Sequence, residues 1–377
     1  MSATAATIVR RFPAFILCLA ACLAIPAVAG AAEVTDTIKM GKDRLISGTI
    51  TDETYEFVFY TAGQAAAAGR VRQCEVESIE WGGRSTHFLA AETARVRGDY
   101  DEAISRYLEA MKSVLAARKF FVEPYCTYYI GLCNQQLGKL DEAQKYFAKL
   151  IKDYPKARFF PYANVALGEL LMSQQQYDKA TECFSVVGKG VDSTLGRPIF
   201  CEDIYYTARL RITDALVAKN DLQAALTELD NVIRETERSF PEISLSALRS
   251  KAMVLVKQQK TDEALKIYRD IIDRSVKGMD GSTSDRELKL SVIVAQCYNG
   301  LGEAYVANGN KHKEALLEFL RVVTVLGPAV GNEYARAGVG AIKCLEALGD
   351  KERAKKLLGD VKADFPNYPG LKALNIK

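Results

Sequence analysis

One short pattern recurs seven times along this chain of 377 residues, and a recurring unit constrains a fold more than any single motif does. Each copy places a turn, usually marked by Gly or Asn, a few residues before an alanine. The first two copies read Gly98-Asp99-Tyr100-Asp101-Glu102-Ala103 and Gly138-Lys139-Leu140-Asp141-Glu142-Ala143. The alanines of the series lie 37 to 51 residues apart and are Ala103, Ala143, Ala180, Ala225, Ala264, Ala315 and Ala354.

Each part of the pattern has a physical role in a pair of antiparallel helices. A Gly or Asn lets the first helix end through left-handed backbone, and we expect the Asp to cap the second helix. The small alanine lets the two helices approach closely. A large apolar residue follows four positions later on the same face: Tyr107, Phe147, Phe184, Leu229, Tyr268, Phe319 or Leu358. Three first helices carry a large residue followed by glycine, which predicts close packing within the hairpin: Ile130-Gly131, Leu167-Gly168 and Leu301-Gly302.

These residues resemble the tetratricopeptide repeat, and the resemblance covers residues 84–377. It implies a mainly α fold, a right-handed solenoid superhelix of about seven helical hairpins. The spacings are longer than the usual 34 residues of the family, and the fourth, fifth and seventh copies depart most from its pattern. Lys149 to Pro155 ends its repeat as exported members of the bacterial envelope often do. Two Gly-rich insertions, Gly188 to Pro198 and Lys277 to Arg286, predict surface loops.

Residues 34–83 have a different pattern, which predicts a small all-β module before the solenoid. Strand signals are Leu45 to Ile50, Glu53 to Tyr60, Val71 to Val76 and Ser78 to Trp81, with a small-residue loop from Gly63 to Gly69. Four or five short strands form a small barrel or roll. The segment loosely resembles the SH3- or Sm-like modules that precede repeats in some bacterial envelope proteins.

Residues 1–31 predict a signal peptide and therefore a periplasmic or other extracytoplasmic location. Arg10 and Arg11 precede an apolar run that is too short for a transmembrane anchor, and Ala27-Val28-Ala29 offers a cleavage site. A minority interpretation uses Leu19-Ala20-Ala21-Cys22 as a lipobox, which would leave a lipid anchor on Cys22. Ordinary cleavage is favoured because the residues after Cys22 stay apolar.

Composition argues against several classes of function. The formal net charge is +3, and removal of Arg10 and Arg11 leaves a nearly neutral chain, so we expect no nucleic acid partner. The two histidines, His87 and His312, have no motif around them, and no nucleotide or nucleophile motif occurs. We expect no enzyme activity, no cofactor and no metal. Most cysteines fall in apolar helical patterns, which favours core packing over a disulfide such as Cys183–Cys201.

The resemblance also implies where a partner binds. Proteins of this family use the concave surface lined by the first helices, and projecting their contact positions onto this chain gives candidate partner-binding residues. An apolar stripe beside carboxylates would suit an extended or helical peptide with a few basic residues. The alternative is that the aromatic residues form core between repeats and the acids are simply solvated. The candidates are Phe88, Glu92, Tyr125, Tyr128, Tyr162, Val165, Glu169, Leu210 and Asp214.

The sequence therefore predicts a non-enzymatic scaffold or assembly factor that binds proteins in the bacterial cell envelope. A binding protein for carbohydrate or peptidoglycan is the alternative, because aromatic and carboxylate side chains also suit sugars.

Overall fold

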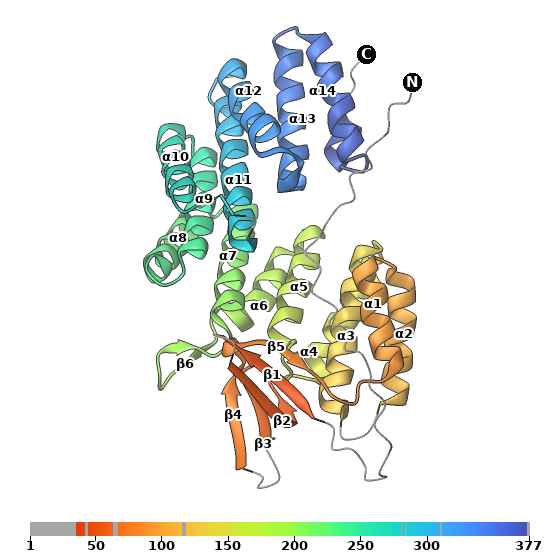
Figure 1. The fold of residues 1–377 in the computed structure, drawn as a ribbon. Coiled ribbons are helices and arrows are strands. Elements are labelled where there is room, and N and C mark those ends of the chain that lie inside the picture. Colours follow the sequence, from red (N-terminus) through yellow and green to blue (C-terminus); the bar gives the residue numbers. More distant parts are fainter. Residues whose placement is uncertain are drawn as a thin grey trace, which may run out of the picture.

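A computed structural model describes residues 35–41, 44–62, 67–114, 118–279, 281–282, 284–309 and 311–374. The predicted signal peptide, its cleavage site and the lipobox at Cys22 lie outside these residues. The described chain begins with a small sheet and continues as a curved stack of fourteen α-helices (Figure 1).

The sheet has five antiparallel strands in the order β4-β3-β2-β1-β5. Its strands are β1 (Asp36–Met40), β2 (Arg44–Glu53), β3 (Phe57–Ala62), β4 (Ala67–Arg72) and β5 (Val76–Glu80). A short 3-10 helix, η1 (Gln73–Glu75), separates β4 from β5. The sheet is open, with β4 and β5 as its edge strands.

The strand predictions were right in kind and wrong at several boundaries. The strand expected from Glu53 to Tyr60 spans the turn between β2 and β3, where the Thr54 hydroxyl accepts a hydrogen bond from the Phe57 amide at 2.9 Å. The expected loop up to Gly69 overlaps β4, because its alanines pair with Thr61 and Ala62 of β3. The strand β1 was not assigned separately from its sequence.

The helices pair in chain order into seven hairpins. Their bounds are α1 (Thr86–Arg97), α2 (Tyr100–Ser113), α3 (Lys119–Gln136), α4 (Leu140–Asp153), α5 (Phe160–Ser173), α6 (Tyr177–Gly188), α7 (Glu202–Ala218), α8 (Leu222–Thr236), α9 (Pro241–Lys257), α10 (Thr261–Lys277), α11 (Asp285–Ala307), α12 (His312–Arg321), α13 (Asn332–Ala347) and α14 (Lys351–Asp364). A π-helical turn (Val322–Leu326) and a 3-10 turn (Gly327–Val330) extend α12, and another 3-10 turn (Pro369–Ala373) follows α14.

The repeated residues occupy the core positions that their spacing predicted. All seven alanines are fully buried, and the large residue four positions later is at most 3% exposed in every copy except Leu358. Each turn within a hairpin contains one residue with a left-handed backbone: Gly98, Gly138, Gln175, Asn220, Gln259, Gly309 or Gly349. The expected aspartate cap is found at Asp221 and Asp350, whose side chains accept backbone hydrogen bonds, and not at the other second helices.

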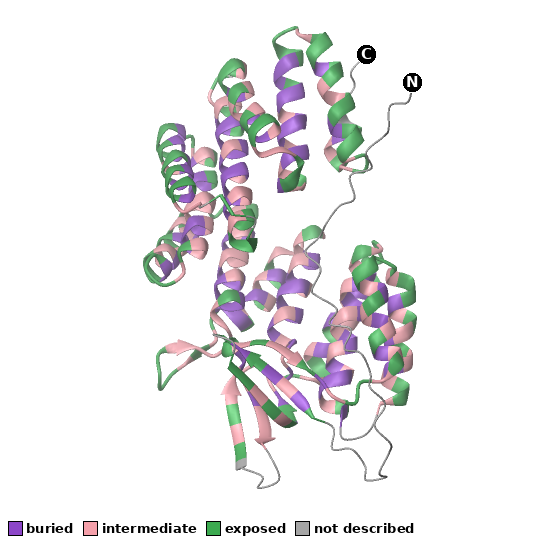
Figure 2. Ribbon diagram, viewed as in Figure 1, coloured by how far each residue is buried: buried purple, intermediate pink, exposed green. Residues whose placement is uncertain are grey.

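The stack curves because its two layers are packed unequally. The first helices of successive hairpins touch one another in the pairs α5–α7, α7–α9, α9–α11 and α11–α13. Within the described residues, no two second helices of neighbouring hairpins are in comparable contact. We call the surface of the first helices the inner face. Buried residues line the facing sides of the helices along the whole stack (Figure 2).

The sheet packs beside the first half of the stack, near the N-terminal ends of α3, α5 and α7 (Figure 1). The Asp36 carboxylate, which is fully buried, lies 2.8 Å from the Arg118 guanidinium just before α3. The Trp81 ring stacks on Phe121 with their centroids 3.8 Å apart. The Tyr55 ring contacts Phe200 just before α7, at 4.9 Å. Buried charge and aromatic contacts therefore fix the sheet to the helices.

The two predicted surface loops differ in the structure. The first contains a small hairpin of β6 (Val191–Asp192) and β7 (Arg197–Pro198), in which the Asp192 carboxylate accepts two backbone hydrogen bonds at the turn. The second lies between α10 and α11, and its residues 280 and 283 are outside the described part of the chain.

Candidate functional site

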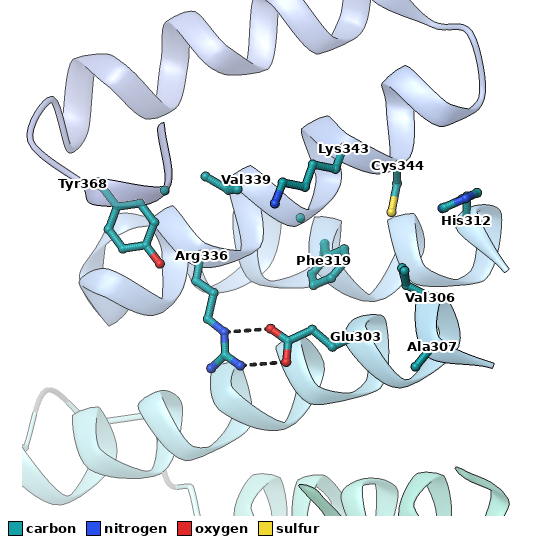
Figure 3. A pocket seen from close by; sticks show the side chains of 12 residues that line it. Glu303, Val306, Ala307, His312, Phe319, Arg336, Val339, Lys343, Cys344 and Tyr368 are labelled. Atoms are coloured by element: carbon teal, nitrogen blue, oxygen red, sulfur yellow. Dashed lines mark hydrogen bonds and ion pairs between the residues drawn. The ribbon is translucent and has the colours of Figure 1, made fainter. Parts of the chain in front are cut away.

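Two pockets open on the inner face. The central pocket has a volume of about 500 Å³ and lies between α7, α9 and α11, with Leu210, Ile243 and Val292 among its apolar lining. The C-terminal pocket has a volume of about 420 Å³ and is lined by α11, α12, α13 and the segment after α14 (Figure 3). Both volumes are in the range that binds small molecules or single side chains, roughly 300–1,000 Å³.

The first predicted binding residues are largely occupied by contacts within the protein. The Phe88 ring is 2% exposed and packs against Tyr107 and Tyr125. The Glu92 carboxylate accepts hydrogen bonds from the Tyr107 hydroxyl, from the Tyr125 hydroxyl at 2.8 Å and from Arg95 at 2.9 Å. Burial, and then the nearby Tyr129 and Glu92, raise the pKa of Tyr125 above its usual value. At this end of the inner face the predicted residues form a satisfied network.

Three further predicted residues form a partly exposed apolar strip. The Tyr128 ring stacks on Phe159, with centroids 4.8 Å apart and the planes 16° from parallel. The Tyr162 ring lies 6.4 Å from that of Tyr128. Val165 is 6% exposed, whereas both tyrosines are half-buried. Tyr128 and Tyr162 therefore present part of their rings on the inner face, and Val165 supports them from below.

The remaining predicted residues are brought together by an arginine. Arg211 donates from Nε to Glu169 Oε1 at 2.6 Å and from its terminal nitrogen to Asp214 Oδ2 at 3.1 Å. Burial raises the pKa of Asp214, although Arg211 acts in the opposite direction. Leu210 is half-buried and lines the central pocket. The structure thus joins Glu169 of α5 to Asp214 of α7 and leaves Leu210 available to a ligand.

The arginines of the inner face were not predicted from the sequence. Arg336 of α13 donates two hydrogen bonds to the Glu303 carboxylate of α11, at 2.8 and 2.7 Å (Figure 3). The ion pairs within single helices could have been predicted from the sequence. Arg95, Arg211 and Arg336 each lie three residues from an acid that they contact, and this spacing favours pairing on one helix. The pairs between hairpins required knowledge of which helices meet.

Two buried polar atoms on or beside the inner face have no hydrogen-bond partner within the described chain. They are Nε of Arg249 on α9 and Nδ1 of His312 at the start of α12. Arg249 contacts only the Met253 sulfur, at 3.5 Å, through another nitrogen. A buried donor or acceptor without a partner is costly, so such atoms mark places where a ligand can improve the contacts.

The described residues contain no group of three His, Cys, Asp or Glu side chains placed to hold a metal ion. They also contain no helix long and apolar enough to cross a membrane. Cys126, Cys133, Cys297 and Cys344 are buried, as expected for core packing, whereas Cys183 is half-buried. Burial raises the pKa of the Cys344 thiol to about 11, which makes it a poor nucleophile. Cys183 and Cys201 are both free thiols.

Comparisons with known proteins agree with the repeat pattern. The tetratricopeptide repeat family model matches residues 125–157 and 339–368, which contain most of the hairpins α3–α4 and α13–α14. A search of curated proteins found no match.

Solved structures give the same fold. A tetratricopeptide repeat protein from Parabacteroides merdae is 16% identical, with a TM-score of 0.53 over 76% of this chain and 95% of that one. The apo form of RapI is 12% identical, with a TM-score of 0.51 over 74% of this chain and 97% of that one. The chain therefore has the fold of a tetratricopeptide-type α-solenoid preceded by a small antiparallel β sheet, and it is similar to proteins of the tetratricopeptide repeat family.

Proposed function

We propose that this protein is a non-enzymatic scaffold that binds a segment of a partner protein along its inner face. The observation that carries the proposal is that first helices line the central pocket and much of the C-terminal pocket, on the surface that solenoids of this kind use for binding. Leu210 lines one pocket, and Glu303 lines the other.

The chemistry of the inner face supports a protein segment as ligand. Its carboxylates at Glu92, Glu169 and Glu303 are already paired with arginines of the same chain. Such pairs hold the helices in register, while the apolar pockets between them remain open. Apolar side chains of a peptide can fill pockets of this kind at intervals along the segment.

The proposal also assigns the protein to the bacterial cell envelope, as an assembly or organising factor. This part rests on the sequence of residues 1–31 and on the resemblance to exported family members. Mass spectrometry of the mature N-terminus tests it, because cleavage after Ala29 and acylation of Cys22 leave different masses. An unprocessed Met1 would contradict export.

The binding claim is tested by affinity capture from envelope extracts with wild-type protein and two matched variants. Leu210→Ser removes an apolar contact from the central pocket, whereas Leu317→Ser changes a residue of α12 that is 62% exposed and lies in neither pocket. We expect a specific protein partner that is lost with Leu210→Ser and kept with Leu317→Ser. Circular dichroism verifies that Leu210→Ser folds. If this variant still captures every partner that the wild type captures, the result would contradict binding at the inner face.

A carbohydrate ligand is the alternative. Sugar sites usually offer an open aromatic face, whereas Phe88 is buried and one face of Tyr128 is covered by Phe159. Sedimentation with purified, protein-free cell wall distinguishes the two functions. We expect the protein to stay in the supernatant, and saturable sedimentation that depends on Tyr128 and Tyr162 would favour the carbohydrate.

A further inference from the structure

The C-terminal pocket has an apolar floor and a charged rim. Its floor consists of side chains that are nearly buried, chiefly Phe319, Val339 and Cys344. Val306 and Ala307 of α11 form one wall, and the segment after α14 contributes Tyr368 on the opposite side (Figure 3). The pocket is therefore shaped to cover a large apolar side chain, since apolar area removed from water provides most of the affinity in such places.

The charges of the rim do not cancel. Glu303, Arg336 and Lys343 are the lining residues with a formal charge when histidine is neutral, and Glu303 is taken up by two hydrogen bonds from Arg336. Lys343 is exposed and forms no ion pair within the described chain. Its ammonium group lies over the pocket, between Tyr368 and Phe319 in Figure 3. Arg336 also pairs with Glu333 at 3.5 Å, so Lys343 is the cation of the rim that has no carboxylate partner among the described residues.

The position of Lys343 in its repeat makes this charge distinctive. Lys343 lies eleven residues before Ala354, and the same offset from their own alanines gives Glu92, Glu169 and Asp214. The position that carries acids in three of the first four hairpins, with Leu132 in the second, thus carries a base in the last. Glu92 pairs with Arg95, whereas Glu169 and Asp214 share Arg211, so each of the three acids already has an arginine partner within the chain.

A second cation, Arg249, lies on the same half of the inner face, where it acts electrostatically on the Asp214 carboxylate. Arg249 forms no ion pair within the described residues, and its buried Nε has no acceptor. At the pocket itself, the buried Nδ1 of His312 is also unsatisfied. Both observations favour a ligand that brings hydrogen-bonding groups, and Lys343 favours an acidic one.

We infer that the C-terminal pocket takes a large apolar side chain of the partner segment, and that Lys343 pairs with an acidic side chain beside it. This inference rests on the proposed function, because it specifies the ligand of the same inner face. It replaces the basic peptide expected from the sequence with an acidic one. The reason is that Glu92, Glu169, Asp214 and Glu303 each already pair with an arginine, whereas Lys343 pairs with no carboxylate within the described residues.

The test begins with selection of random linear peptides, displayed on phage, against the full chain. We expect selected peptides to combine a large apolar residue with Asp or Glu within a few positions. Each peptide is then synthesised in two versions: an acidic peptide that keeps its Asp and Glu residues, and a neutral peptide in which Asn and Gln replace them. Fluorescence anisotropy should give an affinity about five- to tenfold lower for the neutral peptide, with a difference that shrinks as salt is added.

Two matched pairs of variants locate the contact. Lys343→Gln should lower affinity for the acidic peptide about five- to tenfold and leave the neutral peptide unaffected, whereas Lys355→Gln on the exposed side of α14 should change neither. Ala307→Trp should block the pocket and weaken both peptides, whereas Ala363→Trp on α14 should weaken neither.

The outcomes separate the inference from the proposed function. Peptides that bind, depend on Leu210 and yet ignore Lys343→Gln and Ala307→Trp would overturn the inference and leave the inner face as the binding surface. Selection of basic peptides would overturn it in the same way. Peptides that bind without depending on Leu210, Lys343 or Ala307 would overturn both.

Discussion

At the scale of single residues, contacts between glycine and aromatic rings set the spacing within hairpins. A Cβ atom at Gly131, Gly168 or Gly302 would lie 2.4 to 2.6 Å from the nearest ring atom of the phenylalanine in the second helix. These pairs could be predicted, because a large residue followed by glycine recurs at one place in the first helices. The contacts between Glu92 and the hydroxyls of Tyr107 and Tyr125 could not, because they join three helices whose rotation only the structure gives.

The Gly168 contact predicts opposite effects for two substitutions of glycine by alanine. Gly168→Ala would place Cβ 2.4 Å from the Phe184 ring, so we expect a loss of about 1–3 kcal/mol in the free energy of unfolding. Gly359 is exposed in α14, and a Cβ atom added there would meet open space, so Gly359→Ala should raise stability by up to about 1 kcal/mol. Urea denaturation measures both, and equal effects would contradict the packing described.

Glu53 gives a prediction about pH. Burial raises the pKa of Glu53 above its ordinary 4.5, although Arg158 at 3.2 Å opposes this. The folded state therefore binds this proton more tightly than the unfolded state, so its contribution to stability falls as pH rises above about 4.5. The free energy of unfolding of wild type, minus that of Glu53→Gln, should decrease over this range and then level off. A difference that increases with pH would contradict the burial of Glu53.

At the scale of elements, the helices were predictable and the small sheet was less so. Seven copies of one pattern fixed the helix pairs, since each copy contains its own turn and its own core residues. The pattern of each strand occurs only once in the chain. The turn at Thr54 interrupts a segment, Glu53 to Tyr60, whose pattern predicted one continuous strand. The aspartate caps failed as a general rule because Lys139, Gln176, Lys260 and Lys311 occupy the cap position in their hairpins. Asp99 does occupy this position before α2, but its side chain makes no cap hydrogen bond.

The most deeply buried ion pair between the sheet and the helices is that of Asp36 with Arg118. Asp36 accepts hydrogen bonds from Arg118 at 2.8 Å, from the Ile50 amide at 2.7 Å and from the Gly82 amide at 2.8 Å. Asp36→Asn would leave the Arg118 charge buried without its partner, so we expect a loss of about 3–5 kcal/mol in unfolding free energy. The control is Asp101→Asn, which breaks an exposed pair with Lys139 and should cost less than about 1 kcal/mol. Similar losses for both variants in thermal and urea denaturation would contradict the role assigned to Asp36.

At the scale of the whole molecule, the repeats place seven first helices on one inner face, and the ion pairs between them set its charge. The sequence predicted contact residues for that face in the first four hairpins, because most of the candidates recur 15 or 11 residues before the alanines of their repeats. The sequence did not reveal which charged side chains of this face lack a partner. Arg211 and Arg336 each pair with an acid of the preceding hairpin, and these pairs are known only from the structure. Lys343 emerges as the cation of the C-terminal pocket without a carboxylate partner in the described residues only once those pairs are known.

Hydrogen–deuterium exchange with and without a bound partner segment tests the central claim most directly. We expect added protection in α7, α9, α11 and α13, the helices that line the two pockets, and little change in α8, α10 and α14. Protection confined to those second helices or to the β sheet would show that the partner binds elsewhere.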